Sequence, residues 1–182
     1  MSLKKKFALE LAVLGLLCRG PLHGYELRKR VTIHLGPFRA ISFGSLYPEL
    51  KRLLNLNYIE EKESTTERGL TKRARISYQI TPCGTGRLNE ILKNSGPETW
   101  EDETFTTYLS LFARVASSVR LQILQGRKIR LQERISLLQD QLSKTDQQLD
   151  IYTIQISNYN LDSVQREIKW IDELILSERK ES

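Results

Sequence analysis

The sequence predicts a mainly α-helical protein in which three N-terminal helices and a two-stranded β-hairpin precede long C-terminal helices. Three observations predict this fold class. Apolar residues recur at helical spacing in three segments before residue 55. Two strand-like segments follow at 58–63 and 74–80. After Pro97 there is no further proline and only one glycine, Gly126, so the C-terminal half suits long helices.

The first two helices are bounded by glycine–proline pairs. Residues 7–17 are crowded with apolar side chains and end before Gly20-Pro21, which predicts a buried first helix. Residues 22–35 place apolar side chains at spacings suited to a partly buried face, and Gly36-Pro37 ends this second helix. The basic run Arg28-Lys29-Arg30 is expected to stay solvated.

The third helix is expected over residues 42–54, where leucines recur at helical spacing. Either Ser42 or Ser45 can serve as its N-cap. Pro48 lacks a backbone donor and suits only a helix start. Either the opening turn is therefore irregular or the regular helix begins only near Tyr47.

A hairpin is expected after the third helix, because Ala74, Ile76, Tyr78 and Ile80 alternate on one side of the second strand. The connecting loop is polar and rich in cations. Thr81-Pro82 then offers an N-cap followed by proline at the first position of a further helix. The cations of the loop are Arg68, Lys72, Arg73 and Arg75.

An apolar seam with spacings of three and four runs from Leu121 to Tyr159 and resumes at Val164, which predicts a heptad pattern. Residues 158–160 are interpreted as a break between two antiparallel helices. Trp100 and Trp170 are either core residues or the border of an aromatic cavity. The residues expected to form a dimer interface are Leu131, Ile135, Leu138, Leu142, Leu149, Tyr152, Ile156, Tyr159, Ile168, Trp170, Ile171 and Ile175.

The distribution of charge and the motifs that are missing limit the classes of function expected for this protein. The net charge is +6, yet residues 1–94 carry 17 Lys and Arg against 8 Asp and Glu, while residues 95–182 carry 11 against 14. The first half is therefore the candidate polyanion binder. No nucleophile–base pair, metal-ligand spacing or phosphate-binding glycine loop is found, so we expect neither an enzyme nor a cofactor or metal. The absence of a signal-type or bilayer-spanning segment predicts a cytoplasmic protein without membrane contact.

Three helices followed by a hairpin is the order of the winged helix-turn-helix, in which the third helix enters the major groove and the wing touches DNA nearby. Candidate DNA contacts at the third helix are Ser42, Gly44, Ser45, Tyr47, Lys51 and Arg52. The serines alternatively only cap the helix, and Tyr47 alternatively packs in the core. The wing cations are either phosphate contacts or a solvated loop, and Lys4-Lys5-Lys6 are either a DNA-binding arm or a solvated terminus.

Several motifs identify a resemblance. Gly20-Pro-Leu-His-Gly-Tyr-Glu-Leu27 is followed by Gly44-Ser-Leu-Tyr-Pro48 and then by Ser77-Tyr-Gln-Ile-Thr81. In this order they resemble the PadR family of bacterial transcriptional regulators. The long tail is similar to the larger subfamily, whose extended C-terminal helices form the dimer. The resemblance places Tyr25 near the DNA backbone. It places Ser42, Gly44, Ser45 and Tyr47 at the entrance of the recognition helix.

The resemblance implies a sequence-specific repressor that binds an inverted-repeat operator in double-stranded DNA as a homodimer and is released by a small molecule or another signal. Residues 1–94 would bind DNA and residues 95–182 would dimerise. The alternative is a non-enzymatic adaptor that recruits a partner helix through its heptad tail and has only non-specific affinity for DNA.

Overall fold

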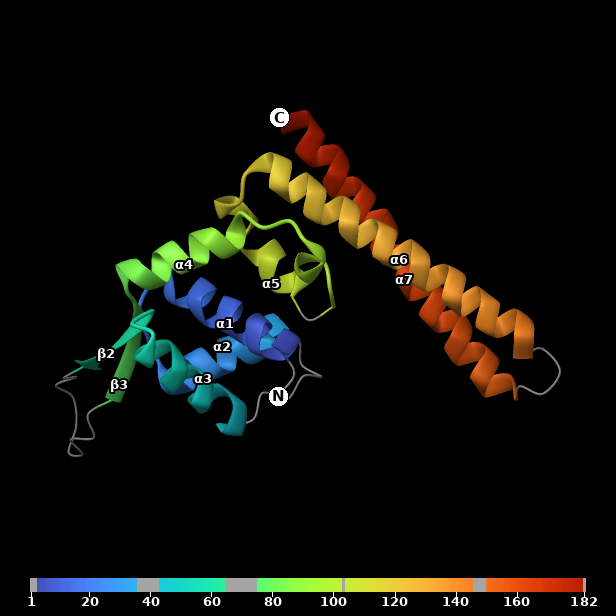
Figure 1. Ribbon diagram of the computed structural model, residues 1–182. Helices are drawn as coiled ribbons and strands as arrows, with labels where there is room; N and C mark the ends of the chain where they lie inside the picture. The colour runs from blue at the N-terminus through green and yellow to red at the C-terminus, as the bar shows by residue number, and fades with distance from the viewer. Residues whose placement is uncertain (1–2, 36–42, 65–74, 103, 146–149, 182) are drawn as a thin grey trace. The chain divides into compact units, whose positions relative to one another are not determined.

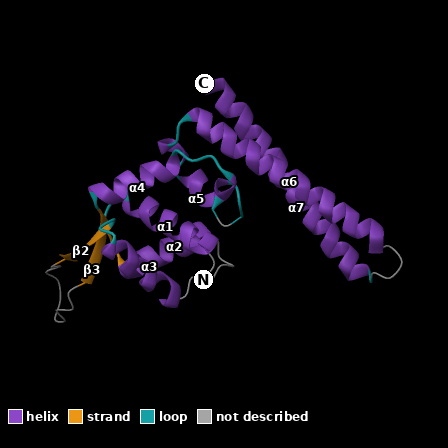
Figure 2. Cartoon of the chain, in the orientation of Figure 1, coloured by secondary structure: helices purple, strands orange, loops and turns teal. Residues whose placement is uncertain are grey.

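The computed structural model of the chain describes residues 3–35, 43–64, 75–102, 104–145 and 150–181. The chain divides into two compact units, one of residues 1–94 with 102–115 and one of residues 95–101 with 116–182 (Figure 1). Helices dominate both units, and the small antiparallel sheet belongs to the first (Figure 2). The predicted fold class is confirmed.

Helix α1 (Leu3–Leu17) is the core of the first unit. Every residue from 8 to 17 is buried, as the crowded apolar sequence predicts. The helix contacts α2 (Gly24–Leu35), α3 (Phe43–Asn55), α4 (Pro82–Leu92) and α5 (Phe105–Ser110). A helix enclosed on so many sides needs apolar residues around its whole circumference rather than along one stripe. A short 3₁₀ turn, η2 (Phe112–Arg114), follows α5.

The sheet has three strands in the order β1-β3-β2, all antiparallel. Strands β2 (Ile59–Ser64) and β3 (Arg75–Ile80) form the predicted hairpin, in which Ile59 pairs with Ile80. The sequence did not predict β1 (Leu22–His23), which pairs with β3 on its other side. Because these two residues belong to the sheet, helix α2 begins at Gly24 and not at residue 22.

Helix α3 begins at Phe43, so the interpretation that it starts near Tyr47 is wrong. Pro48 lies inside the helix, where it removes the backbone bond to the carbonyl of Gly44 in the first turn. Gly44 is exposed, and water can therefore reach that carbonyl. The predicted cap Ser42 lies outside the described residues.

Helix α4 begins as the Thr81-Pro82 pair predicts. The Thr81 hydroxyl accepts a hydrogen bond from the Gly84 backbone N–H at 3.0 Å, and it donates one to the carbonyl of Asn57 at 2.6 Å. Gly84 itself cannot carry a side chain, because a Cβ there would lie 2.8 Å from the Tyr58 carbonyl carbon. The cap and the glycine together hold the start of α4 against the end of the turn that follows α3.

The second unit is an antiparallel pair of long helices, α6 (Ser117–Thr145) and α7 (Ile151–Glu181), with the short turn η1 (Pro97–Thr99) beside them. Ion pairs join the two helices with opposite chain directions. Arg120 near the start of α6 bonds Glu178 near the end of α7 at 2.7 Å, and Lys128 bonds Asp172 at the same distance. Of the helices in the described ranges, none is long and apolar enough to cross a membrane.

Helix α6 ends at Thr145 and α7 begins at Ile151, so the interpretation of 158–160 as the break is wrong. Residues 158–160 are helical, and α7 continues through them. Asp150 marks the true start of α7, because its Oδ1 accepts hydrogen bonds from the backbone N–H groups of Tyr152 at 2.8 Å and Thr153 at 3.1 Å.

Trp100 packs on α6 at Gly126, the one glycine of that helix. A Cβ at Gly126 would lie 2.6 Å from Cζ3 of the indole and closer still to two other ring atoms. The Trp100 carbonyl accepts a hydrogen bond from Nη1 of Arg127 at 3.0 Å, and Arg127 also pairs with Glu167 of α7. Trp100 also borders an open hollow of about 470 Å³ within this unit, together with Gln122 and Ile129.

Candidate nucleic-acid interface

Helix α3 has one buried face and one exposed face. Leu46, Leu50 and Leu53 are almost completely buried, which fixes the helix on the core. Gly44, Tyr47 and Lys51 are exposed, and their spacing of three and four places them on one side of the helix. Ser45 is half-buried. A side of this kind, with a small residue, an aromatic and a cation, can enter a DNA groove.

The exposed side of α3 shares a hollow with the start of α2 and with strand β3. The hollow has a volume of about 630 Å³, and Tyr25, Tyr47 and Ile76 line it. Their side chains are 73%, 44% and 47% exposed, so all three can reach a partner. Tyr47 is thus not a core residue, so the interpretation that it packs in the core is wrong. The hollow is also lined by His23, Gly24, Glu26 and Tyr78.

The tyrosines suit a phosphate-bearing partner. Burial, followed by the charge of Glu61 and the phenol of Tyr47, raises the pKa of Tyr78 above its usual value. This phenol is therefore protonated at neutral pH and brings no negative charge to the surface. Phenol hydroxyls donate hydrogen bonds to phosphate oxygens, and the rings offer apolar area to sugars and bases.

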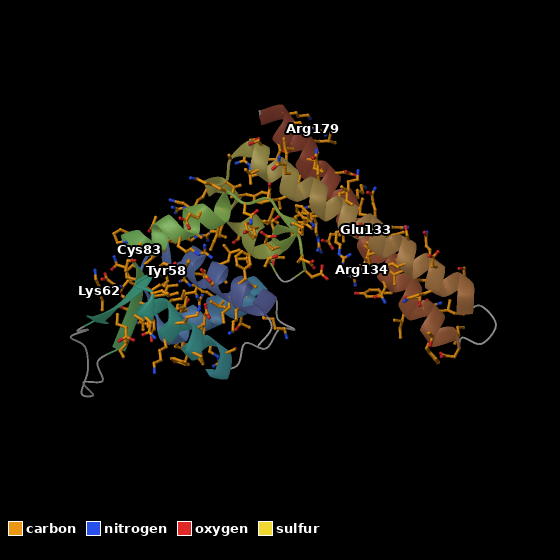
Figure 3. All side chains as sticks on the ribbon, viewed as in Figure 1. Tyr58, Lys62, Cys83, Glu133, Arg134 and Arg179 are labelled. Carbon is orange, nitrogen blue, oxygen red and sulfur yellow. The ribbon has the colours of Figure 1, made fainter. Side chains whose placement is uncertain are left out.

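The charged side chains of α2, α3 and β2 are only partly paired within these elements. Arg30 donates to Glu26 at 2.8 Å, and this hydrogen bond is the main cause that lowers the pKa of Glu26. Lys29 and Lys51 are exposed. Lys62 projects from β2 and lies 3.8 Å from Glu60 (Figure 3). Exposed pairs of this kind contribute little to folding, so their cations can serve a polyanion instead.

The structure brings together only part of the predicted DNA-binding set. Tyr25 and Tyr47 meet at the hollow, while Lys51 lies one helical turn further along α3. Arg75 is the first residue of β3. Arg52 lies on α3 but bonds to Glu49 and Glu10 within the protein. Four predicted residues fall outside the described ranges, namely Ser42, Arg68, Lys72 and Arg73.

Sequence reasoning missed Ile76 and His23 as residues of this surface. Ile76 shares the alternating apolar side of β3 with Tyr78, and the alternation was used only to predict the hairpin. Only Tyr78 is buried, because Ile76 lies nearer the hairpin end of the strand. The Nδ1 atom of His23 is buried and, within the part of the chain that the structure describes, has no hydrogen-bond partner.

The predicted dimerisation residues divide by exposure. The buried ones pack within a single chain, where α6 contacts α7, and their role in a dimer remains a prediction. Leu149 lies outside the described residues. The buried members are Leu131, Ile171 and Ile175; the half-buried ones are Ile135, Leu138, Leu142 and Ile168; the exposed ones are Tyr152, Ile156, Tyr159 and Trp170.

The first turns of α7 carry their apolar residues on the outside. Tyr152, Ile156 and Tyr159 are 76%, 62% and 67% exposed and follow one another at spacings of four and three. We call these three residues the outer stripe. The half-buried positions in the same turns are polar, among them Thr153 and Ser157. This inverted pattern is typical of a helix face that a partner covers.

Within the described ranges, His, Cys, Asp and Glu side chains form no group of three or more that could hold a metal ion. Cys18 and Cys83 are free thiols. The described surface of α2, α3 and β3 offers tyrosines, cations and an exposed helix side.

Comparisons with known proteins agree with this chemistry. The family model described as the transcriptional regulator PadR-like family matches residues 13–90. The negative transcriptional regulator PadR of Bacillus subtilis (strain 168) is 33% identical over 130 residues, which are 69% of this chain and 70% of that protein.

Solved structures were also compared with the chain. Bacillus subtilis PadR in complex with operator DNA is 22% identical, with a TM-score of 0.43 and coverage of 93% of this chain and 98% of that one. The same protein in complex with p-coumaric acid is 20% identical, with a TM-score of 0.42 and coverage of 96% and 97%. A Streptococcus mutans UA159 protein is 21% identical, with a TM-score of 0.43 and coverage of 92% and 98%.

Proposed function

The chain belongs to the PadR-like family of transcriptional regulators, so it regulates transcription and is not an enzyme, and we propose that it is a homodimeric repressor of an inverted-repeat operator. One observation carries the DNA-binding part of this proposal. The exposed side of α3, the start of α2 and strand β3 meet at one hollow, where Tyr25, Tyr47 and Ile76 are all accessible.

In the proposed complex, α3 enters the major groove with Gly44 and Tyr47 foremost. Glycine lets the backbone approach a phosphate, and the phenol can donate to a phosphate or a base edge. Tyr25 and Lys51 would contact phosphates on either side and so set the orientation of the helix. The hairpin would bring Arg75, with Arg68, Lys72 and Arg73, to the neighbouring backbone, where each neutralised phosphate releases counterions.

The outer stripe supports the proposed dimer. Three large apolar side chains in about two turns of one helix are costly in water unless a partner covers them. A second copy is the partner that we propose, so residues 95–182 would dimerise and residues 1–94 would bind DNA. A two-fold dimer presents two α3 helices to half-sites about 34 Å apart, and an inverted repeat matches that symmetry.

The relatives support repression and its release as parts of the proposal. The Bacillus subtilis protein is named a negative regulator, and it forms a complex with p-coumaric acid. We propose that this chain likewise blocks transcription and is released by a small molecule. A regulator that acts on the chromosome of a bacterium would work in the cytoplasm.

The proposal is tested by binding of the full chain to DNA from its own upstream region and to a scrambled DNA, over a salt series. The test variant is Arg73→Ala with Arg75→Ala. The matched control is Arg130→Ala with Arg134→Ala, which removes the same charge from α6 in the second unit. Arg134 is labelled in Figure 3.

We expect wild-type protein to prefer its own upstream DNA and to lose affinity steeply as salt rises. Each wing arginine that contacts a phosphate contributes about 0.9 to the slope of log affinity against log salt. The wing variant loses two arginines from each subunit of the homodimer, so its slope should be shallower by about 3.6. The control should behave as wild type. Weak binding that is equal on both DNAs would instead favour the adaptor that recruits a protein partner.

A further inference from the structure

Buried charges join three helices of the first unit. Glu10 lies on α1 and is only 6% exposed. Its Oε2 accepts a hydrogen bond from Nη2 of Arg52 on α3 at 2.6 Å, and its Oε1 accepts one from Nε of Arg87 on α4 at 3.0 Å. Helix α1 contacts both α3 and α4 in this unit (Figure 1). A single carboxylate therefore ties the recognition helix to both of the others.

Arg52 also holds a second buried carboxylate, which belongs to its own helix. Its Nε and Nη2 donate to Glu49, the latter at 2.6 Å, and Glu49 is 4% exposed. These bonds fix the guanidinium along α3 but cannot fix α3 to the rest of the unit. Within the described residues of this cluster, only Glu10 bonds to more than one other helix.

The cluster is balanced in charge. Two buried carboxylates face two guanidinium groups, and the bonds to Glu49 and Glu10 raise the pKa of Arg52 above its usual value, while Glu10 does the same for Arg87. Removal of one partner from such a group leaves another charge buried without compensation. The arrangement therefore holds only while α1, α3 and α4 keep their mutual positions, because charge-assisted bonds of 2.6 to 3.0 Å tolerate little displacement.

We infer that Glu10 is a positioning residue for DNA recognition, which fixes α3 in the orientation that reads an operator. This inference rests on the proposed function. Glu10 is buried and does not contact DNA itself. It acts through Arg52, which was predicted to touch DNA and instead has its Nε and Nη2 engaged inside the protein. Preference for an operator depends on a few precisely placed contacts, whereas affinity for non-specific DNA depends mainly on total charge. A shifted α3 should therefore weaken the preference for the operator and leave the affinity for non-specific DNA unchanged.

The test variant is Glu10→Gln, which keeps the size of the side chain. Its amide can accept from only one arginine, and its NH₂ group faces the other. The matched control is Glu90→Gln, since Glu90 pairs with the same Arg87 at 3.7 Å but is exposed. The readouts are the ratio of affinities for the protein's own upstream DNA and for scrambled DNA, measured at constant folded fraction, and hydrogen exchange of the α3 amides.

We expect Glu10→Gln to lower the affinity ratio about tenfold, with unchanged affinity for scrambled DNA, and to speed exchange in α3. Glu10→Asp keeps the negative charge but has a shorter side chain. Its affinity ratio should lie between those of wild type and Glu10→Gln. Glu90→Gln should match wild type within about twofold. A merely structural role would lower the folded fraction without moving the ratio.

The inference is overturned if Glu10→Gln keeps both the wild-type ratio and the wild-type exchange of α3. Should this variant not fold, Arg87→Gln removes the bond between α1 and α4, together with the exposed pair to Glu90, and leaves Glu10 paired with Arg52. Arg87→Gln should lower the ratio several-fold, and an unchanged ratio would again overturn the inference. If wild type prefers neither DNA, the proposed function has failed, and exchange in α3 still decides whether Glu10 holds the helix.

Discussion

Substitution of Gly126 by alanine should destabilise the second unit, although alanine is normally the better helix residue. Replacing glycine inside a helix gains about 1 kcal/mol. Against this gain, the new Cβ would lie 2.6 Å or less from three atoms of the Trp100 ring, whereas ordinary contact begins near 3.4 Å. Overpacking of this kind typically costs about 1–3 kcal/mol. The clash should prevail, because the bond from Arg127 to the Trp100 carbonyl resists movement of the ring.

Urea unfolding of the full chain measures the change, with Trp fluorescence as one signal and helical circular dichroism as the other. Gly86→Ala is the matched control. Gly86 is also inside a helix, but a Cβ there would meet no atom within 4 Å. We expect Gly86→Ala to stabilise the protein by about 1 kcal/mol and Gly126→Ala to destabilise it by about 1 kcal/mol. In a Trp100→Ala background, Gly126→Ala should become stabilising. Equal stabilisation by both alanines in wild-type protein would refute the argument.

Three further outcomes follow from the structure. Ile156→Asp places a charge in the outer stripe and should shift sedimentation from dimer to monomer. Gln155→Asp, at an exposed position on another side of α7, should still sediment as a dimer. If both variants sediment as dimers, the proposed interface is contradicted. Thr81→Ala removes the α4 cap and should cost about 1 kcal/mol in urea unfolding, with Thr81→Ser close to wild type, so equal losses would argue against capping. Hydrogen bonds from Thr153 lower the pKa of Asp150, so its stabilising contribution is present above the unfolded-state pKa and disappears as pH falls through the lower folded-state value. Hydrogen exchange at the start of α7, expressed as protection relative to the unfolded chain at each pH, should therefore fall with pH in wild type and not in Asp150→Ala. The same loss of protection with falling pH in both proteins would contradict the prediction.

Local patterns in the sequence were sufficient for most of the fold. Crowded apolar residues predicted the buried α1, alternation predicted the hairpin, and Thr81-Pro82 predicted the start of α4. Each of these signals lies within a short stretch of consecutive residues. Strand β1 is only two residues long, and it pairs with β3 far along the chain, so no local pattern could announce it.

The predicted position of the break between α6 and α7 was wrong because the heptad spacing continues from one helix into the next. Tyr152, Ile156 and Tyr159 continue the heptad spacing of α6, so the seam read as one uninterrupted helix. In the structure these residues lie on the exposed side of the next helix. Asp150 was the available signal, because a short acidic side chain before an apolar run is a typical N-cap.

The sequence was sufficient to predict the tyrosines of the candidate site but not the buried ion pairs that hold α3 in place. Tyr25 and Tyr47 belong to recognisable motifs, and the structure brings them to one hollow. The bonds of Glu10 to Arg52 and Arg87 span 42 and 77 residues of sequence, and no spacing rule connects such positions. Arg52 was accordingly predicted as a surface contact, while its main partners are buried carboxylates.

Hydroxyl-radical footprinting on the protein's own upstream DNA tests the central claim most directly, with wild type and Ile156→Asp titrated side by side. A homodimer with two α3 helices in successive major grooves predicts two protected segments about 10 base pairs apart, related by two-fold symmetry, that appear together for wild type and are lost or need far more protein for Ile156→Asp. One unsymmetrical segment, or the same protection by both proteins, would contradict the account.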